Sequence, residues 1–371
     1  PPPPPHYRHP TTRPTPQPNP PHDLPATRLA ETDAPPLADG EARLAVRRFA
    51  LTANNVTYAV FGDVMQYWNF FPAPDGMGRV GVWGYADVVE SRSDLLAVGE
   101  RLFGYLPFGD SLVIQPGGAT KSAIKDLSPW RQPMSPFYNE YVRCAADPSY
   151  DPGLENEACL YRPLFMTGFL LDAWLADAAQ FGTSRVIASS ASSKTALAMA
   201  YGVSRRSGVE MIGLTSPRNA AFVQGSGLYS RVLTYDQIGD LGGADAVYVD
   251  FAGDGAVTGA VHATLKDRLK HSAMAGGANW DAPREPPPDA PAPELFFAPA
   301  VLAQRMTQWG PAGFQARYGE AWRGFLTAVS GFLATKELGG LAAGQTAWST
   351  LLDGAAAPDT GLVVVIEKQH S

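Results

Sequence analysis

The sequence predicts a mixed α/β fold in which a β-rich region precedes and follows a region of alternating strands and helices. Before about residue 162, several segments have strand-like sequences, and Gly81–Ser91 alternates with the period of two that is typical of strands. From Pro163 on, strand and helix patterns take turns, as in a doubly wound parallel sheet. An apolar run at Gly361–Glu367 predicts a closing strand. A chain of 371 residues is long enough for two such domains.

Composition limits the class of function. The formal net charge of −7 argues against a nucleic-acid surface. Cys144 and Cys159 are too few for a disulfide scaffold or a structural zinc site. There is no apolar run that could cross a bilayer and no signal-peptide pattern, so we expect a soluble, cytoplasmic protein without a membrane partner. Residues 1–26 are rich in proline and predict a disordered extension.

Each element follows from its local pattern. In the β-rich region, β-branched and aromatic residues predict strands at 43–50, 55–59, 81–91, 100–107 and 136–143. In the second region, apolar runs and helix formers predict strands at 186–188, 209–214, 245–251 and 272–275, and helices at 164–181, 195–201, 256–269 and 301–333.

A turn of small polar residues separates the first of these strands from its helix. Strand, turn, helix and second strand together form the first half of a dinucleotide-binding βαβ unit. The free N–H groups at the start of the helix would suit a pyrophosphate. Glycines are usual in such a turn, and here serines replace them. The candidate phosphate-binding residues are Ser189, Ser190, Ser192, Ser193, Lys194 and Thr195. Lys194 could equally cap a surface turn.

The end of the second strand predicts which nicotinamide cofactor is used. A carboxylate at this place would bind the adenosine ribose, and none is present. Ser216 and Arg218 stand there instead and suit a 2′-phosphate, which favours NADPH over NADH. The alternative is that Arg218 lies on a solvated loop. Asp250 ends its strand and is expected to face the cofactor.

The order of these features resembles the medium-chain dehydrogenase/reductase superfamily. Three patterns carry the resemblance: Val98–Tyr105 resembles the family's turn between paired strands, Phe137–Val142 its "Y-A-E-Y-V" strand, and Leu351–Val365 its terminal segment. The resemblance implies a GroES-like catalytic domain over residues 27–162 and 339–371, and an inserted Rossmann-like domain over 163–338. It is also compatible with a homodimer. The chain is most similar to a divergent branch of zinc-free quinone and enoyl reductases.

Departures from the family pattern concern the metal. Gly84 and Tyr85 stand where zinc-dependent members have a His-Glu pair, and both cysteines lie outside the ligand positions. We therefore expect no zinc.

Without zinc, a phenol, hydroxyl or amide must stabilise negative charge on the substrate. The segment from Asn54 to Tyr58 resembles the segment that lines the substrate site in zinc-free relatives. The resemblance implies Tyr58 as proton donor, with Asn55 or Thr57 as orienting group. The alternative is that Tyr58 packs in the core and Asn55 caps a turn.

Together these features predict an NADPH-dependent, zinc-free oxidoreductase. It would transfer hydride to an activated alkene or carbonyl of an apolar or aromatic small molecule. Two alternatives stay open. One is a non-redox, lyase-type enzyme that uses the same fold, and the other is a non-catalytic NADPH-binding protein.

Overall fold

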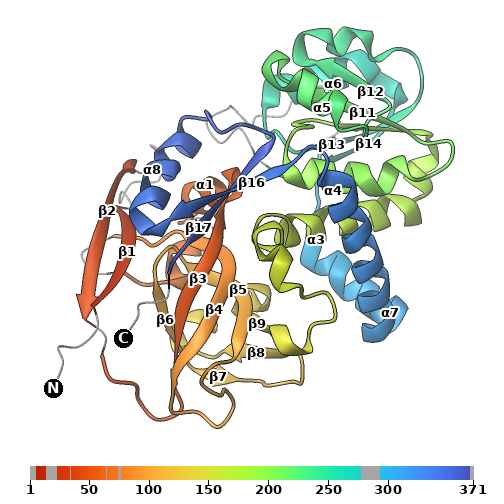
Figure 1. Ribbon diagram of the computed structural model, residues 1–371. Helices are drawn as coiled ribbons and strands as arrows, with labels where there is room; N and C mark the ends of the chain where they lie inside the picture. Colours follow the sequence, from red (N-terminus) through yellow and green to blue (C-terminus); the bar gives the residue numbers. More distant parts are fainter. Residues whose placement is uncertain are drawn as a thin grey trace. The chain divides into compact units, whose positions relative to one another are not determined.

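The chain folds into two compact units, which we describe separately. A computed structural model describes residues 6–13, 23–33, 35–63, 65–73, 77–276 and 293–367. Unit 1 comprises Pro1–Leu160 and Thr335–Ser371, and unit 2 comprises Tyr161–Ala334 (Figure 1).

Unit 1 is built on an antiparallel sheet. Its described strands follow the order β16-β17-β3-β4-β5-β9-β8-β7, and β6 also pairs with β3. The central strands β3, β4 and β5 run side by side in Figure 1 and bury most of their residues. The strands are β3 (Ala42–Leu51), β4 (Gly81–Ser91), β5 (Arg101–Pro107), β6 (Ser111–Ile114), β7 (Pro116–Gly117), β8 (Ala123–Asp126), β9 (Glu140–Arg143), β16 (Ala334–Gly339) and β17 (Thr360–Val365). The helices are α1 (Ala53–Val60), α2 (Pro136–Asn139) and α8 (Gly340–Leu352).

Unit 2 contains a parallel sheet whose described strands follow the order β12-β11-β10-β13-β14-β15. This is the order 3-2-1-4-5-6 of a dinucleotide-binding fold. Successive strands are added on one side of β10 up to β12, and on the other side from β13 on, so the strand order reverses between β10 and β13. The strands are β10 (Arg185–Ala188), β11 (Glu210–Thr215), β12 (Arg231–Thr234), β13 (Ala246–Asp250), β14 (Leu269–Met274) and β15 (Glu294–Leu295). The helices are α3 (Glu155–Asp177), which begins in unit 1, α4 (Lys194–Ser204), α5 (Ala220–Gly225), α6 (Gly255–Leu265) and α7 (Ala298–Val329).

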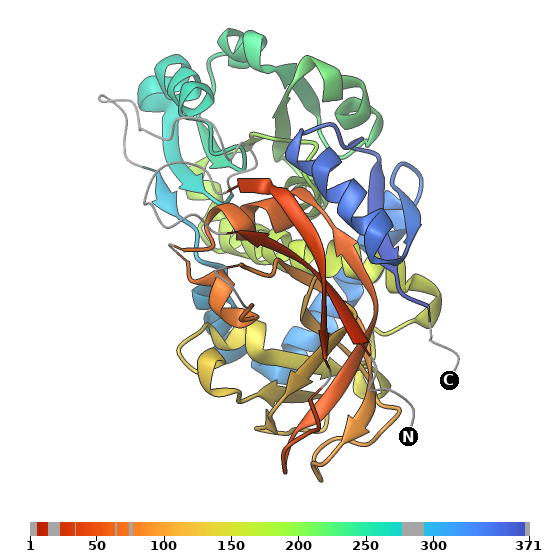
Figure 2. The same cartoon turned by 90° about the vertical axis from the view of Figure 1, so that its left-hand side faces the viewer.

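The N-terminal segment corrects one prediction. Strand β1 (His6–Arg13) pairs antiparallel with β2 (Asp23–Asp33), shown in red in Figure 2, so residues 1–26 do not form a disordered extension throughout. The indole Nε1 of Trp348 donates to the carbonyl of Leu24 at 3.1 Å, and the Leu24 side chain is buried. This contact with α8 supplies the apolar anchor that the proline-rich composition did not suggest. Residues 1–5 and 14–22 lie outside the described residues.

Three further elements differ from the prediction. Residues 55–59 lie in helix α1 and not in a strand. Thr52 caps that helix, because its hydroxyl accepts from the Asn54 N–H and its own N–H donates to the Asn55 side chain. The segment at 136–143 is a helical turn followed by the short strand β9, and the helix predicted from residue 164 begins at Glu155. Among the described residues, no helix is both long and apolar enough to span a bilayer.

Candidate functional site

The serine turn of unit 2 lies where the sheet reverses its strand order. Ser189 directly follows β10, and Asp250 ends the neighbouring strand β13. Their side chains meet, because the Ser189 hydroxyl donates to Asp250 Oδ1 at 2.6 Å. Ligands of doubly wound sheets bind at the carboxyl ends of the strands, at such a reversal point. The structure therefore brings these two predicted residues together at the expected edge.

Ser189 and Asp250 are buried and use their polar atoms within the protein. The Ser189 hydroxyl accepts from the N–H groups of Phe251 and Ala252 at 2.8 and 3.0 Å. Asp250 Oδ1 also accepts from the Ala252 N–H, and Oδ2 accepts from the Thr258 hydroxyl. A carboxylate with several donors keeps its charge compensated in a buried position. The pair thus joins the two loops that border the crevice.

This pair supports our first testable prediction. In a Ser189→Ala variant, the Phe251 N–H loses its acceptor and Asp250 loses a donor, while both stay buried. We expect the free energy of unfolding to fall by about 1–3 kcal/mol. Urea denaturation monitored by circular dichroism measures it. Ser207→Ala, at an exposed position after α4, is the matched control and should change stability by less than about 0.5 kcal/mol. Equal urea midpoints of unfolding for the two variants would contradict the assigned role of Ser189.

Ser190 takes the backbone conformation that glycine adopts without strain. Its φ angle is +46°, in the left-handed region, which costs a serine about 1 kcal/mol. Its N–H donates to the phenol oxygen of Tyr235 at 3.1 Å. The turn therefore follows a glycine-like path although it contains no glycine, and Tyr235 occupies one of its backbone donors.

The N-terminus of α4 offers the remaining donors. The Ser193 hydroxyl caps the helix by accepting from the Ala196 N–H at 3.3 Å. The N–H groups of Ser192 and Thr195 make no hydrogen bond to any other described residue, and both residues are half-exposed. Lys194 is half-exposed in the same turn. Free N–H groups at the start of a helix attract anions.

A second loop joins the serine turn. Ser216 and Arg218 follow β11, the first half-exposed and the second exposed. The Asn219 side chain of this loop donates to the Ser192 hydroxyl at 3.0 Å. The other atom of that amide, Asn219 Oδ1, is buried and accepts no hydrogen bond from the described residues. The loops after β10 and β11 thus lie together, and they place a half-exposed hydroxyl and an arginine at the same edge.

Unit 1 holds the predicted proton donor. Tyr58 lies in α1, with 6% of its surface exposed. Its phenol oxygen accepts from Asn54 Nδ2 at 2.7 Å and from Trp83 Nε1 at 3.0 Å. Burial raises the pKa of Tyr58 most, followed by the neighbouring phenol of Tyr67. The phenol therefore keeps its proton at neutral pH. Asn54 and Trp83 both donate to its oxygen, so neither of them uses the hydrogen of the phenol itself.

Asn55 and Thr57 lie on the same helix as Tyr58 but make local contacts. Asn55 is buried, and its Nδ2 donates to the carbonyl of Gly81 at 2.9 Å, which ties α1 to β4. The hydroxyl of Thr57 donates to the Ala53 carbonyl at 3.3 Å, within the helix. The role of either residue in orienting the substrate stays a prediction. Asn55 caps α1 and links it to β4, and Thr57 makes a hydrogen bond within the helix.

Tyr58 belongs to a group of aromatic side chains that we call the aromatic cluster. Its members, which come from α1, β4, β5 and α2 and from the segment between α1 and β4, are Tyr58, Tyr67, Phe70, Phe71, Trp83, Tyr105, Phe137 and Tyr138. The phenol oxygens of Tyr67 and Tyr138 lie 3.0 Å apart, and both side chains are half-buried. The ring of Tyr138 contacts that of Tyr58 edge-on, with ring centroids 6.1 Å apart. The buried Tyr58 therefore lies beside two phenols that are more exposed.

Sequence reasoning missed Asn54, Trp83 and Tyr235 as partners of site residues. The spacing of Asn54 and Tyr58 by four residues is a detectable signal, because such residues lie on one face of a helix. Trp83 and Tyr235 contact residues far away in the sequence and leave no comparable signal. In the part of the chain that the structure describes, no three His, Cys, Asp or Glu side chains are grouped so that they could hold a metal ion.

Solved oxidoreductases share the fold of this chain. CurA from Vibrio vulnificus in complex with NADPH is 17% identical with a TM-score of 0.58, covering 98% of this chain and 100% of CurA. A putative NADPH:quinone reductase from Mesorhizobium loti is 12% identical with a TM-score of 0.59, covering 97% and 98% of the two chains. The YhdH oxidoreductase from Salmonella enterica in complex with NADP is 14% identical with a TM-score of 0.54, covering 97% and 100%.

These similarities confirm the predicted α/β class, with a β-rich GroES-like part and a Rossmann-like part, and the resemblance to the medium-chain dehydrogenase/reductase superfamily at the level of the fold. No curated protein matches the chain by sequence. A family model described as "Protein of unknown function (DUF2855)" matches residues 49–357, which is most of the chain. The chain therefore belongs to this family.

Proposed function

We propose that the protein is an NADPH-dependent, zinc-free oxidoreductase that reduces an activated alkene or carbonyl of an apolar or aromatic small molecule. The observation that carries the proposal is the reversal point of the parallel sheet, where the glycine-like serine turn opens helix α4. Similar structures that were solved with NADPH or NADP share this fold. Gly84 and Tyr85 stand where zinc-dependent members of the medium-chain dehydrogenase/reductase superfamily have a His-Glu pair, and this supports a mechanism without zinc.

The chain offers a set of groups that fit a dinucleotide phosphate. The N–H groups of Ser192 and Thr195, together with the N-terminus of α4, would bind the pyrophosphate. Ser189 and Asp250 would hold the two loops in place, as their mutual hydrogen bond indicates. Ser216 and Arg218 would bind the 2′-phosphate, because a guanidinium and a hydroxyl both donate to phosphate oxygens. NADPH, when bound, supplies the hydride.

The role of unit 1 is to supply the proton. Tyr58 carries its proton at Oη because burial raises its pKa. Asn54 and Trp83 would fix the direction of the phenol by donating to its oxygen, which leaves the hydrogen for a substrate oxygen or carbon. Tyr138 and Tyr67 would restore that proton from more exposed positions. The aromatic cluster favours a flat, apolar substrate.

Arg218 provides the second testable prediction. Replacing Arg218 with Ala should weaken NADPH binding by at least about tenfold and leave NADH binding nearly unchanged, because only NADPH has the 2′-phosphate. Fluorescence titration with each nucleotide measures both dissociation constants. Arg205→Ala is the matched control, since Arg205 caps the opposite end of α4. A ratio of the two constants that does not move in Arg218→Ala would refute the assigned role.

A titration of the unmodified protein tests the proposal as a whole. Binding of NADPH, followed by its oxidation in the presence of enones, quinones or enoyl thioesters, is the expected result. One observation favours the lyase-type alternative: Tyr235 occupies the Ser190 N–H and leaves the turn with fewer donors for a phosphate. Absence of nucleotide binding would therefore replace our proposal with that alternative. Tight binding without turnover would replace it with a non-catalytic NADPH-binding protein.

A further inference from the structure

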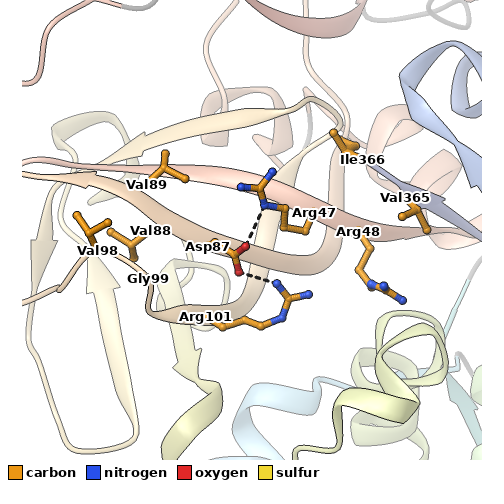
Figure 3. A pocket seen from close by; sticks show the side chains of 10 residues that line it. All are labelled: Arg47, Arg48, Asp87, Val88, Val89, Val98, Gly99, Arg101, Val365 and Ile366. Atoms are coloured by element: carbon orange, nitrogen blue, oxygen red, sulfur yellow. Dashed lines mark hydrogen bonds and ion pairs between the residues drawn. The ribbon is translucent and has the colours of Figure 1, made fainter. Parts of the chain in front are cut away.

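Unit 1 has an open hollow of about 600 Å³ on the central part of its antiparallel sheet (Figure 3). Residues of β3, β4 and β5 and of the end of β17 line it. Trp83 of the aromatic cluster and Asp87 of the hollow are both on β4, four residues and therefore roughly 13 Å apart. The hollow is thus a feature separate from the proposed proton donor.

A bulge in β3 turns Arg47 toward the hollow. Val46 pairs with Ala86 and Arg48 pairs with the adjacent Tyr85, so Arg47 is an extra residue without a partner on β4. Arg47 Nε donates to Asp87 Oδ2 at 2.9 Å. The two terminal nitrogens of this guanidinium make no hydrogen bond to any described residue, and Figure 3 shows them pointing away from Asp87. Arg47 therefore presents a free pair of parallel donors.

The charges around the hollow do not balance. Asp87 also accepts from Arg101, its direct partner across β4 and β5, at 2.6 Å. Glu155 accepts from Arg101 at 2.7 Å and forms an ion pair with Arg48 at 3.1 Å. Three partly buried guanidiniums thus share two carboxylates, the half-buried Asp87 and the buried Glu155. Glu337, which lies 3.7 Å from Arg48, is 56% exposed and therefore compensates weakly.

Part of the wall of the hollow is apolar. Val98 and Val89 are 64% and 39% exposed, and the partly buried Val365 and Ile366 complete this surface. An exposed apolar surface beside unsatisfied cationic donors matches a molecule that combines a carboxylate with a hydrocarbon part. A fully apolar partner would leave the Arg47 donors unsatisfied, and a small inorganic anion would leave the valines exposed.

We propose that this hollow binds an organic monocarboxylate with a short hydrocarbon tail. The terminal nitrogens of Arg47 donate to the two carboxylate oxygens, and the tail covers Val89, Val98 and Ile366. Asp87 holds Arg47 in place from the neighbouring strand, and Arg101 in turn holds Asp87. This site is additional to the proposed reductase function and involves no nicotinamide cofactor.

Calorimetric titration of the full chain with octanoate, without any nucleotide, tests the proposal. We expect saturable binding of octanoate, and binding at least about tenfold weaker for acetate, which lacks the tail, and for octanol, which lacks the charge. Arg47→Gln should weaken octanoate binding by at least about tenfold. Arg47→Lys keeps the charge but not the paired donors, and should have an intermediate affinity.

The matched control is Arg92→Gln, because Arg92 forms an exposed ion pair with Asp39 on the same unit. It should bind octanoate as the unmodified protein does. Equal affinities for octanoate and acetate, or an Arg47→Lys variant that is folded and binds octanoate with unchanged affinity, would overturn the proposal.

Discussion

Replacing Tyr58 with Phe is expected to lower the turnover number of NADPH-dependent reduction by about 10²- to 10⁴-fold, the usual loss when a positioned proton donor is removed. The dissociation constant of NADPH should stay within about twofold, because the proposed nucleotide-binding residues lie in unit 2. Steady-state kinetics with an enone, combined with NADPH titration, measures both. Turnover within about threefold of that of the unmodified protein would exclude Tyr58 as the proton donor.

Tyr105→Phe is the matched control for this experiment. The Tyr105 phenol is also buried in the aromatic cluster, but its oxygen has no hydrogen-bond partner among the described residues. Its removal should leave turnover nearly unchanged. Tyr58→Phe also deprives the buried Trp83 Nε1 of its acceptor, which should cost about 1–3 kcal/mol of stability. Urea denaturation of both variants therefore separates a loss of catalysis from a loss of folded protein.

Replacing Arg131 with Met is expected to lower the free energy of unfolding by about 3–5 kcal/mol, the usual cost of breaking a buried ion pair. Arg131 and Asp126 are both essentially inaccessible to solvent, and Nη1 lies 2.9 Å from Oδ2. The same guanidinium donates to Tyr141 Oη at 2.8 Å and to the Tyr138 carbonyl at 2.7 Å. Removing it leaves the Asp126 carboxylate buried, with Ser128 and Gln115 as its remaining donors among the described residues. Urea denaturation gives the difference.

Arg92→Met is the control, since its ion pair with Asp39 is exposed and should contribute less than about 1 kcal/mol. Adding Asp126→Asn to Arg131→Met should recover part of the loss, because the uncompensated charge is then gone. A single variant as stable as Arg92→Met, or a double variant less stable than Arg131→Met, would show that the pair does not stabilise unit 1.

The sequence was most informative where one pattern ran for many residues. The strand at Gly81–Ser91 was predicted with the observed bounds, because eleven residues of strand-forming sequence outweigh local ambiguity. The helix that carries Tyr58 was mistaken for a strand, because eight residues make barely two turns and its cap uses Asn55 where Glu or Gln would be the usual signal. Asn55 and Tyr58, whose site roles are implied by the resemblance, therefore lie on a helix where the sequence predicts a strand.

In unit 2 the sequence indicated the strand–turn–helix order but not the contacts within the turn. Ser189 forms a hydrogen bond with Asp250, which is 61 residues away in the sequence, and Ser190 forms one with Tyr235, which is 45 residues away. Neither pairing follows from spacing, because only the order of the parallel strands brings these loops to one edge of the sheet. Sequence reasoning could therefore nominate the serines as a group, whereas the separate role of each one depends on tertiary structure.

The left-handed backbone of Ser190 has a consequence for how such proteins are detected. This chain keeps a left-handed residue in the loop but lacks the glycines by which such a loop is usually identified. A search for the glycine motif would overlook this chain, and a search by backbone dihedral angles at the end of the first parallel strand would find it. Other chains without the motif can be screened in the same way, beginning with those in which a serine or asparagine occupies the left-handed position.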